Sequence, residues 1–444
     1  MKKLLLILLC LPFIGFGQNQ IIWNAISDVS LSSFGNNHPR IVHDGGGNPL
    51  VIWNNSNNVM FSKWNGLTFS TPIELNPTNI DVAGASFMGP DIASHGDTIY
   101  VVYKENPENL ITTPIWCTAS YDNGVTFQTA VKIENSPTSM TRFPTITTDD
   151  SGNPIVAFMK LDSSFTNARW FVSVSNDFGT SFQSPVLASG WSSPTSEVCD
   201  CCPGSIVSSG DNILMLYRDN NSNIRDTWVG ISSDLGNSFS NGVNLSNQNW
   251  FLNSCPGSGP DAVIIGDTLY STFMNGSSGL NRVYFSKLSL ITLTTTSANL
   301  LTGNISGLSQ QNYPRIAKSG NSLAFVWNQN INGNYQLPII SSENINNGIP
   351  LNYDTVSLNN IKNTDIVMFD NQICVVWEDD NSGTVKYRFG TFSIPSTVSE
   401  STFIGNKKLL KVTDLLGRET TDIKNEVLFY IYDDGTVEKR IIIE

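Results

Sequence analysis

Short runs of β-branched and aromatic residues recur along most of the chain and are separated by turns rich in Gly and Asn. The first copy is residues 39–41, a turn, and then the run over residues 50–53. The same phrase returns at intervals of 51 to 59 residues, with its proline at Pro39, Pro90, Pro144, Pro203, Pro260 and Pro314. A seventh copy, residues 365–367 followed by 373–377, lacks the proline. No segment has the periodicity of an amphipathic helix, so the pattern predicts strands throughout.

Several short strands repeated at this spacing are typical of a β-propeller of four-stranded blades. The proline phrase is expected to form the innermost strand of each blade, and the aromatic-ended run the second strand. Seven copies predict seven blades, and six is the alternative if one copy is a partial blade. Residues 20–33 are expected to add the outer strand of the last blade, which would close the ring and remove exposed edges. The predicted fold class is all-β.

An eight-residue motif marks the turn after the third strand in three repeats. Its pattern is Ser-x-Asp-x-Gly-x-x-Phe, with its aspartates at Asp122, Asp177 and Asp234. Such an aspartate accepts hydrogen bonds from the backbone further along the turn, and the glycine permits a positive φ. A weaker copy over residues 62–69 has Trp64 in place of the aspartate. These aspartates are expected to shape turns and not to act in catalysis.

The motif resembles the Asp-box, or BNR repeat, of sialidase-type β-propellers. The resemblance covers residues 19–397 and implies a site that holds an acidic sugar with three arginines. The Arg-Ile-Pro phrase of that family is present only with its residues reordered, at Pro39-Arg40-Ile41 and Pro314-Arg315-Ile316. No residue matches the family's Tyr/Glu nucleophile pair. The family's acid/base aspartate corresponds to Asp91 or Asp226, and spacing does not choose between them.

The two ends of the chain indicate export. Residues 1–18 have a basic start, an apolar run and small residues at a suitable cleavage position, which predicts a signal peptide. No later stretch is long and apolar enough to span a membrane. Residues 398–444 contain Asp414-x-x-Gly417-Arg418 and a final Tyr-x-Asp-Gly hairpin, and they resemble the C-terminal sorting domain of the Bacteroidetes type IX secretion system. This implies the type IX machinery as a partner and a secreted or cell-surface location.

Composition narrows the classes of partner. The net charge is -13 and only 14% of residues are charged, which argues against nucleic-acid binding, because that requires a basic face. We expect a monomer. The histidines His38, His43 and His95 lack metal-ligand or triad spacing and are interpreted as polar surface residues.

Charged residues fall where first strands begin and second strands end, which is the funnel face of a propeller. The arginines in this set are Arg40, Arg142, Arg218, Arg225 and Arg315. Guanidinium groups bind carboxylates in bidentate fashion, so arginines converging on one axis would suit an acidic sugar. The alternative is that each arginine pairs with a neighbouring carboxylate.

Four cysteines precede the first strands of two adjacent repeats, at Cys199, Cys201, Cys202 and Cys255. With Cys117 and Cys374 they make six in the exported chain. Disulfides are expected in an exported protein, and one could join the two blades through Cys255. The alternatives are a soft metal such as copper or zinc, and a vicinal Cys201–Cys202 bridge. Acidic turns at residues 149–153 and 379–381 are either plain turns or Ca²⁺ sites.

Three functions follow from these patterns. The first is an exported recognition module that binds glycans, acidic ones in particular, in the propeller funnel. The second is an exo-glycosidase of sialidase type, and the third is a structural surface scaffold.

Overall fold

The computed structural model describes residues 21–85, 87–134, 138–358, 360–392, 408–421, 427–433 and 437–441. These residues form eight antiparallel sheets, and their one helical element is the 3-10 turn η1 (Ile345–Asn347). The predicted all-β class is confirmed. The chain divides into two compact units, residues 1–393 and residues 394–444. None of the described residues belongs to a helix of the length and apolarity needed to cross a membrane.

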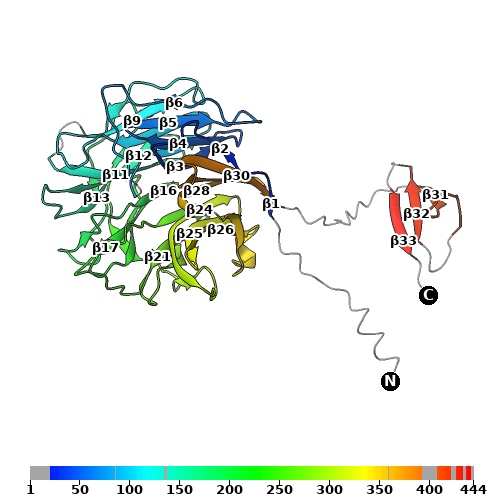
Figure 1. Cartoon of the computed structure of the whole chain (residues 1–444). Helices are drawn as coiled ribbons and strands as arrows, with labels where there is room; N and C mark the ends of the chain where they lie inside the picture. The colour runs from blue at the N-terminus through cyan, green and yellow to red at the C-terminus, as the bar shows by residue number, and fades with distance from the viewer. Residues whose placement is uncertain are drawn as a thin grey trace. The chain divides into compact units, whose positions relative to one another are not determined.

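Seven of the sheets are radial blades, and Figure 1 shows their first strands toward the middle of the unit. Blade 1 contains β3 (Asn36–His43), β4 (Pro49–Asn55), β5 (Asn58–Lys63) and β6 (Ile73–Glu74). Blade 2 contains β7 (Asp91–His95), β8 (Thr98–Lys104), β9 (Ile115–Ser120) and β10 (Val131–Lys132). Blade 3 contains β11 (Met140–Thr148), β12 (Pro154–Leu161), β13 (Arg169–Val174) and β14 (Val186–Leu187). Blade 4 contains β15 (Glu197–Val198), β16 (Ser205–Ser209), β17 (Asn212–Asn220), β18 (Thr227–Ser232) and β19 (Asn241–Asn244), with β15 and β16 both paired to β17.

The remaining blades follow the same order. Blade 5 contains β20 (Asp261–Ile265), β21 (Thr268–Asn275), β22 (Arg282–Ser289) and β23 (Asn299–Leu300). Blade 6 contains β24 (Leu308–Ser319), β25 (Ser322–Ile331), β26 (Asn334–Ser342) and β27 (Asp354–Ser357). Blade 7 is β28 (Ile361–Phe369), β29 (Gln372–Asp379) and β30 (Thr384–Phe392), completed by β1 (Ile21–Trp23) and β2 (Ser27–Asp28). The blade number is therefore seven, and not six.

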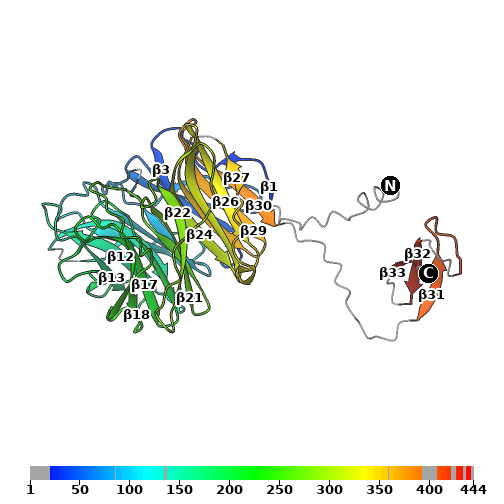
Figure 2. The ribbon, with the colours of Figure 1, turned by 90° about the horizontal axis from the view of Figure 1, so that it is seen from below.

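The ring closes through the N-terminal segment. Strand β1 pairs antiparallel with β30, with Ile21 opposite Phe392, so the first described residues complete the last blade. Each innermost strand contacts the innermost strand of the next blade, from β3 through β7, β11, β16, β20, β24 and β28 back to β3. Figure 2 shows the same sheets from below. The predicted closure by residues 20–33 is confirmed.

An aromatic side chain at one position of every second strand fills the space between blades. The seven side chains are at most 1% exposed, and they are Trp53, Tyr103, Phe158, Tyr217, Phe273, Trp327 and Trp377. Each buries roughly 150–250 Å² of surface, so this set supplies much of the inter-blade core. The aromatic-ended runs in the sequence therefore have a packing role that recurs once per blade.

The three Ser-x-Asp-x-Gly-x-x-Phe motifs form one kind of turn. In the first copy, Asp122 Oδ1 accepts a hydrogen bond from Thr126 N at 2.8 Å, and Gly124 N donates to Ser120 Oγ at 2.8 Å. Asp177 and Asp234 make the equivalent bonds. The glycines have positive φ, 78° at Gly124. These aspartates form turns, as the sequence predicts.

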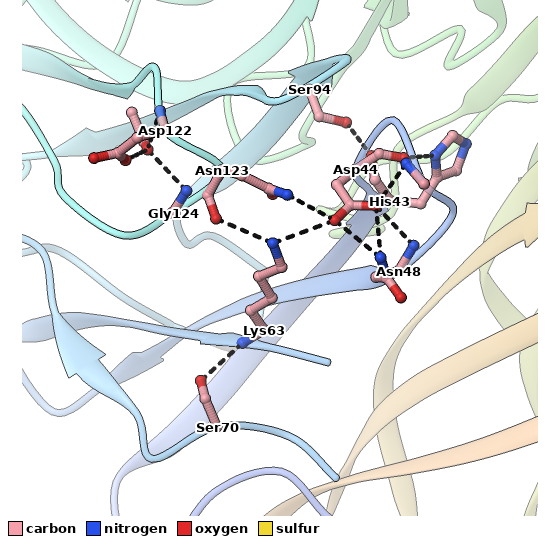
Figure 3. A network of polar contacts seen from close by, with 11 residues as sticks. His43, Asp44, Asn48, Lys63, Ser70, Ser94, Asp122, Asn123 and Gly124 are labelled. Carbon is pink, nitrogen blue, oxygen red and sulfur yellow. Dashed lines mark hydrogen bonds and ion pairs between the residues drawn. The ribbon is translucent and has the colours of Figure 1, made fainter. Parts of the chain in front are cut away.

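The turn of blade 2 also fastens blade 1, as Figure 3 shows. Asp44, in the β3–β4 turn, accepts hydrogen bonds from Asn123 Nδ2 at 3.0 Å and from Asn48 N at 2.8 Å. Lys63 Nζ lies 3.3 Å from the same carboxylate. We call Asp44, Asn123 and Lys63 the inter-blade latch. It lies at the ends of the blades opposite to the starts of the innermost strands.

The second unit is described over three strands, β31 (Leu409–Thr413), β32 (Val427–Tyr432) and β33 (Val437–Ile441). A turn follows β31, in which Asp414 Oδ1 accepts hydrogen bonds from Leu416 N and Arg418 N, both at 2.9 Å. Arg418 Nε also lies 2.7 Å from Asp414 Oδ2. The Asp-x-x-Gly-Arg phrase is therefore a self-contained turn. The predicted signal peptide lies outside the described residues.

Candidate functional site

One residue from each innermost strand occupies an equivalent position around the propeller axis. Each is paired with the residue that precedes the buried aromatic of the second strand, as Arg40 is with Ile52 and Asp365 with Val376. We call this set the axial ring: Arg40, Asp91, Thr145, Ser205, Asp261, Arg315 and Asp365. Because innermost strands surround the axis, the ring gathers two guanidinium groups and three carboxylates from distant parts of the sequence.

The ring carboxylates bind the backbone of neighbouring blades. Asp365 Oδ2 accepts a hydrogen bond from Ile41 N at 3.0 Å, and Asp261 Oδ2 accepts one from Ile316 N at 3.0 Å. Asp91 Oδ2 accepts from Ile146 N at 3.2 Å and from Thr145 Oγ1 at 2.8 Å. Charge-assisted bonds of this kind are stronger than neutral ones. The three aspartates therefore tie blades together.

The two ring arginines differ in their partners. Arg315 Nε lies 2.8 Å from Asp365 Oδ1 and 3.4 Å from Asp261 Oδ2. Burial alone would lower the pKa of Arg315, but the attraction of Asp261 and Asp365 outweighs burial and raises it above its usual value. Arg315 therefore stays charged, and its positive charge is balanced by carboxylates of the protein itself.

Arg40 has neutral partners. Its Nη1 donates to Pro39 O at 2.8 Å, and its Nη2 lies 2.7 Å from His38 Nε2. In the described part of the chain, no carboxylate lies within ion-pair distance of Arg40. Burial, followed by repulsion from Arg315, lowers the pKa of Arg40, and the more distant Asp365, Asp91 and Asp261 oppose this. Arg40 is thus a partly buried cation without an ion-pair partner.

His38 is not the surface residue that the sequence suggested. Its side chain is 5% exposed, and it lies against Arg40. Burial first, then Arg40 and Arg315, hold the pKa of His38 well below its ordinary value, so the ring is neutral. Its Nε2 can then accept a hydrogen bond from the guanidinium. Its backbone N–H donates to Glu378 Oε1, which also accepts from Asn363 Nδ2 at 2.7 Å.

Two positions before each ring residue, a second circle of residues surrounds the mouth of the axis. We call these the mouth residues: His38, Gly89, Phe143, Pro203, Gly259, Tyr313 and Asn363. Four of the innermost strands contain a β-bulge at this point, and the bulged residue has a positive φ, between 39° and 54°, at His38, Phe143, Tyr313 and Asn363. Such conformations cost about 1–3 kcal/mol each and concentrate at functional sites, so the repeated strain marks the mouth as a candidate site.

The mouth residues and part of the ring enclose a cavity of about 60 Å³, which we call the axial cavity. Its polar lining includes Arg40, Arg315, Asp91 and Tyr313. A channel of about 310 Å³ lies along the innermost strands, and it shares Asp91, Thr145 and Arg315 with the axial cavity. Pockets for whole small molecules measure about 300–1,000 Å³, so the axial cavity has room for a small charged group and not for a whole sugar.

The structure places the other three predicted arginines elsewhere. None of them lines the axial cavity. Arg142 pairs with Glu108 at 2.9 Å and donates to Asp200 O at 2.8 Å. Arg225 Nε donates to Leu252 O at 3.3 Å. The ring position of blade 3 belongs to Thr145, which pairs with Ala157, whereas Arg142 stands three positions earlier and pairs with Met159.

Arg218 is completely buried and has a structural role. Its three nitrogens donate to Ser258 O at 3.1 Å, Arg225 O at 2.8 Å and Met274 O at 2.7 Å. The guanidinium also packs on the Trp250 ring at 5.1 Å. Burial lowers the pKa of Arg218 to about 9. Each of its three nitrogens is bound to a backbone carbonyl and the side chain is fully buried, so Arg218 is not accessible to a ligand.

The candidate acid/base residues also accept hydrogen bonds from other groups of the protein. Asp226 is 1% exposed and accepts hydrogen bonds from Asn244 Nδ2 at 2.9 Å and from Asn249 N at 3.1 Å. It does not line the axial cavity. Asp91 does, but its Oδ2 is used by Thr145 and Ile146.

The four clustered cysteines form two disulfides, Cys199–Cys202 and Cys201–Cys255. The second joins the loops that precede the first strands of blades 4 and 5, as expected, and the vicinal Cys201–Cys202 bridge is not formed. The sulfurs of Cys199, Cys201 and Cys202 lie within 4.8 Å of one another. Since metal ligands must be thiolates, these atoms could hold a soft metal only after reduction. Cys117 and Cys374 are buried free thiols, and burial raises the pKa of each.

Sequence reasoning missed several residues of the site. The neutral His38 and the mouth residues Tyr313 and Asn363 were not singled out as site residues. A usable signal was present, because each mouth residue stands two positions before the ring residue in the repeated phrase. Aligning the proline-containing copies on the residue after the proline would have given Thr145 in place of Arg142.

Comparison with known proteins identifies the class of fold. No protein-family description matches the chain, and no curated protein matches it. Among solved structures it is similar to a PL25 ulvan lyase bound to a GlcA–Rha3S saccharide, with 12% identity, TM-score 0.52, and 83% of this chain and 95% of that chain covered. It is also similar to a Dyadobacter fermentans protein of unknown function, with 9% identity, TM-score 0.50 and coverage of 84% and 99%. A Trypanosoma rangeli sialidase in complex with sialic acid aligns with 11% identity, TM-score 0.48 and coverage of 73% and 58%.

These likenesses and the closed ring of seven sheets define the protein as a β-propeller. Its structural neighbours include sialidase, arabinanase and lyase propellers.

Proposed function

We propose that this protein is an exported β-propeller that recognises glycans, and that it holds an acidic group of the glycan in the axial cavity. The observation that carries the proposal is Arg40, a guanidinium at the axis whose polar partners are a carbonyl and a neutral imidazole. A carboxylate or sulfate would supply the missing counter-charge through bonds that are stronger than those to neutral groups. The bound saccharide of the ulvan lyase, which carries GlcA and a sulfated sugar, is of this chemical class.

The size of the axial cavity supports recognition of one group and not of a whole sugar. At about 60 Å³ the cavity suits a carboxylate or a sulfate, while the rest of the saccharide would lie outside it. The neutral His38 helps to hold Arg40 in place for an acidic group, because its Nε2 can accept a hydrogen bond from the guanidinium. As a neutral imidazole, it adds no second positive charge.

Recognition is favoured over hydrolysis by the state of the nearby carboxylates. Glycoside hydrolysis generally uses two carboxyl groups at the scissile bond, one of which donates a proton. Asp91 accepts hydrogen bonds from Thr145 and Ile146 of blade 3, and Asp226 lies outside the axial cavity. A fluorogenic sialoside assay tests this point, since turnover abolished by Asp91→Asn would favour the glycosidase.

The binding proposal is tested with an array of glycans that carry uronic acid, sialic acid or sulfate, followed by titration of a hit. Replacing Arg40 with Ala should weaken that binding by about tenfold or more, because a hydrogen-bonded charge pair is lost. Arg169→Ala is the matched control, since Arg169 Nη1 also donates to the preceding carbonyl, of Ala168, at 2.9 Å, but it does not line the axial cavity. Equal binding by Arg40→Ala would contradict the proposal.

We also propose that the protein reaches the cell surface or medium through its two ends. The basic and apolar start of residues 1–18 and the Asp414 turn with the hairpin β32–β33 support this. The partner would be the type IX secretion machinery. Removing residues 398–444 should retain the propeller inside the outer membrane, as measured by cell fractionation and immunoblotting.

A further inference from the structure

A second cavity lies beside the axial cavity, between blades 6 and 7. Its volume is about 390 Å³, and it is lined by residues of β24, β25, β26 and β28 and of the loops next to them. It shares the mouth residues Tyr313 and Asn363 with the axial cavity, so the two open at the same end of the propeller. We call it the side groove. Its volume lies within the range of about 300–1,000 Å³ for small-molecule sites.

The side groove is lined mainly by amides and tyrosines. The amide side chains are Gln310, Asn312, Asn328, Asn360 and Asn363, and the tyrosines are Tyr313 and Tyr335. An amide both donates and accepts hydrogen bonds, and so does a sugar hydroxyl. A tyrosine ring offers an apolar face with a polar edge, which suits the C–H face of a pyranose. Tyr335 is 36% exposed, and its hydroxyl accepts from Gln310 Nε2 at 3.2 Å.

One buried amide in the side groove lacks a partner. Asn328 is 4% exposed, and its Nδ2 donates to Ile361 O at 2.8 Å, which fixes the orientation of the amide. Its Oδ1 has no hydrogen-bond partner. This oxygen is enclosed in the wall of the side groove, and a buried acceptor is costly when it is left unpaired, so a donor that reached it would be stabilised there. A sugar hydroxyl is such a donor.

The charges of the side groove are already balanced. Lys362 Nζ and Asp380 Oδ2 pair at 2.7 Å on its exposed edge. Among the groove residues that the structure describes, these two are the ionic ones, so the side groove carries no uncompensated charge. It therefore differs from the axial cavity with its unpaired Arg40, and it does not select for an anion.

We propose that the side groove is a binding site for a neutral pyranose of an oligosaccharide, held by Asn328 and Tyr335. The proposal extends glycan recognition to a second site, and it does not require the axial cavity to bind an acidic group. An acidic oligosaccharide could use both sites at once because they share Tyr313 and Asn363.

The test uses the exported chain and three neutral probes: cellotetraose, mannotetraose and galactotetraose. Saturation-transfer NMR and calorimetric titration should detect saturable binding of at least one of them. Tyr335→Ala should weaken that binding by about tenfold or more, because the aromatic platform is removed. Asn328→Ser should also weaken it, whereas Arg40→Ala should leave it unchanged.

Tyr121→Ala is the matched control, since Tyr121 is also a partly exposed tyrosine, 47% exposed, but does not line the side groove. Unfolded variants are identified by their thermal melts, and Tyr335→Phe, which keeps the ring, should bind nearly as well as the parent. Failure of all three probes to bind, or equal binding by Tyr335→Ala and Tyr121→Ala, would overturn the proposal. If Arg40→Ala loses binding of acidic glycans and no neutral probe binds the parent, the proposal for the axial cavity is supported and the proposal for the side groove is wrong.

Discussion

Arg315 and Asp365 lie 2.8 Å apart across the boundary between blades 6 and 7, and the same carboxylate accepts the backbone N–H of Ile41 in blade 1. One aspartate therefore connects three blades at the axis. This geometry assigns Arg315 a structural partner, although its position in the repeated phrase is equivalent to that of Arg40.

Replacing Asp365 with Ala should destabilise the propeller by about 2–4 kcal/mol, because a partly buried guanidinium loses the nearer of its two carboxylates and a backbone N–H loses its acceptor. Chemical denaturation of the exported chain measures this. Lys362→Ala is the control, since it breaks a surface pair with Asp380 that should be worth about 0–1 kcal/mol. Similar losses of unfolding free energy in the two variants would show that the axial ring does not stabilise the contacts between blades.

The inter-blade latch predicts a pH dependence of stability (Figure 3). Burial would raise the pKa of Asp44, but hydrogen bonds from Asn123 and Asn48 and contact with Lys63 prevail and lower it to about 2. Because the folded pKa lies below the unfolded value of 3.8, the stabilisation is present above pH 3.8 and is lost as pH falls toward 2. It amounts to about 2 kcal/mol.

Asp44→Asn should remove this part of the pH dependence. Urea denaturation of the parent and the variant at pH 6 and pH 2 measures the difference between them, which should shrink at the lower pH. A difference that is the same at both pH values would contradict the latch.

The disulfides predict a pattern of thiol reactivity. Alkylation of the denatured, unreduced exported chain should label Cys117 and Cys374 and leave the four clustered cysteines unlabelled. A metal site would instead release all six thiols after treatment with a chelator, and mass spectrometry of peptides distinguishes the two results.

The Cys201–Cys255 bridge spans 54 residues and joins two blades. Cys255→Ser should lower the stability by about 2–4 kcal/mol, because the unfolded chain regains the freedom that the bridge removes. Thermal melts of the parent with and without reductant provide the comparison. An unchanged melting temperature in the variant would argue against the bridge.

Arg218 should be needed for folding and not for binding. Arg218→Met leaves three buried carbonyls without their donor, and the expected loss of stability is on the order of 3 kcal/mol or more. Glycan binding measured well below the melting temperature should be retained. A loss of affinity without a loss of stability would return Arg218 to the list of ligand-binding residues.

The sequence determined the architecture of the propeller because its signals are local and repeated. A Pro phrase, an aromatic-ended strand and a Ser-x-Asp-x-Gly turn each act within a few residues, and their spacing of about fifty residues sets the blade. The closure by the N-terminal strand followed from the same reasoning, since the last repeat lacks an outer strand and residues 20–33 lack another partner.

The site depended on the tertiary structure. Which residue of each repeat faces the axis depends on the strand register. In blade 3, Thr145 pairs with Ala157 at the ring position, while Arg142 pairs with Met159 and binds Glu108. Whether an arginine can bind a ligand depends on its neighbours in space. Arg315 contacts two carboxylates from other blades, Arg218 contacts three carbonyls, and Arg40 contacts one carbonyl and a neutral imidazole. The sequence thus determined how the chain folds into a ring, while packing between blades decided which of its charges are left to meet a partner.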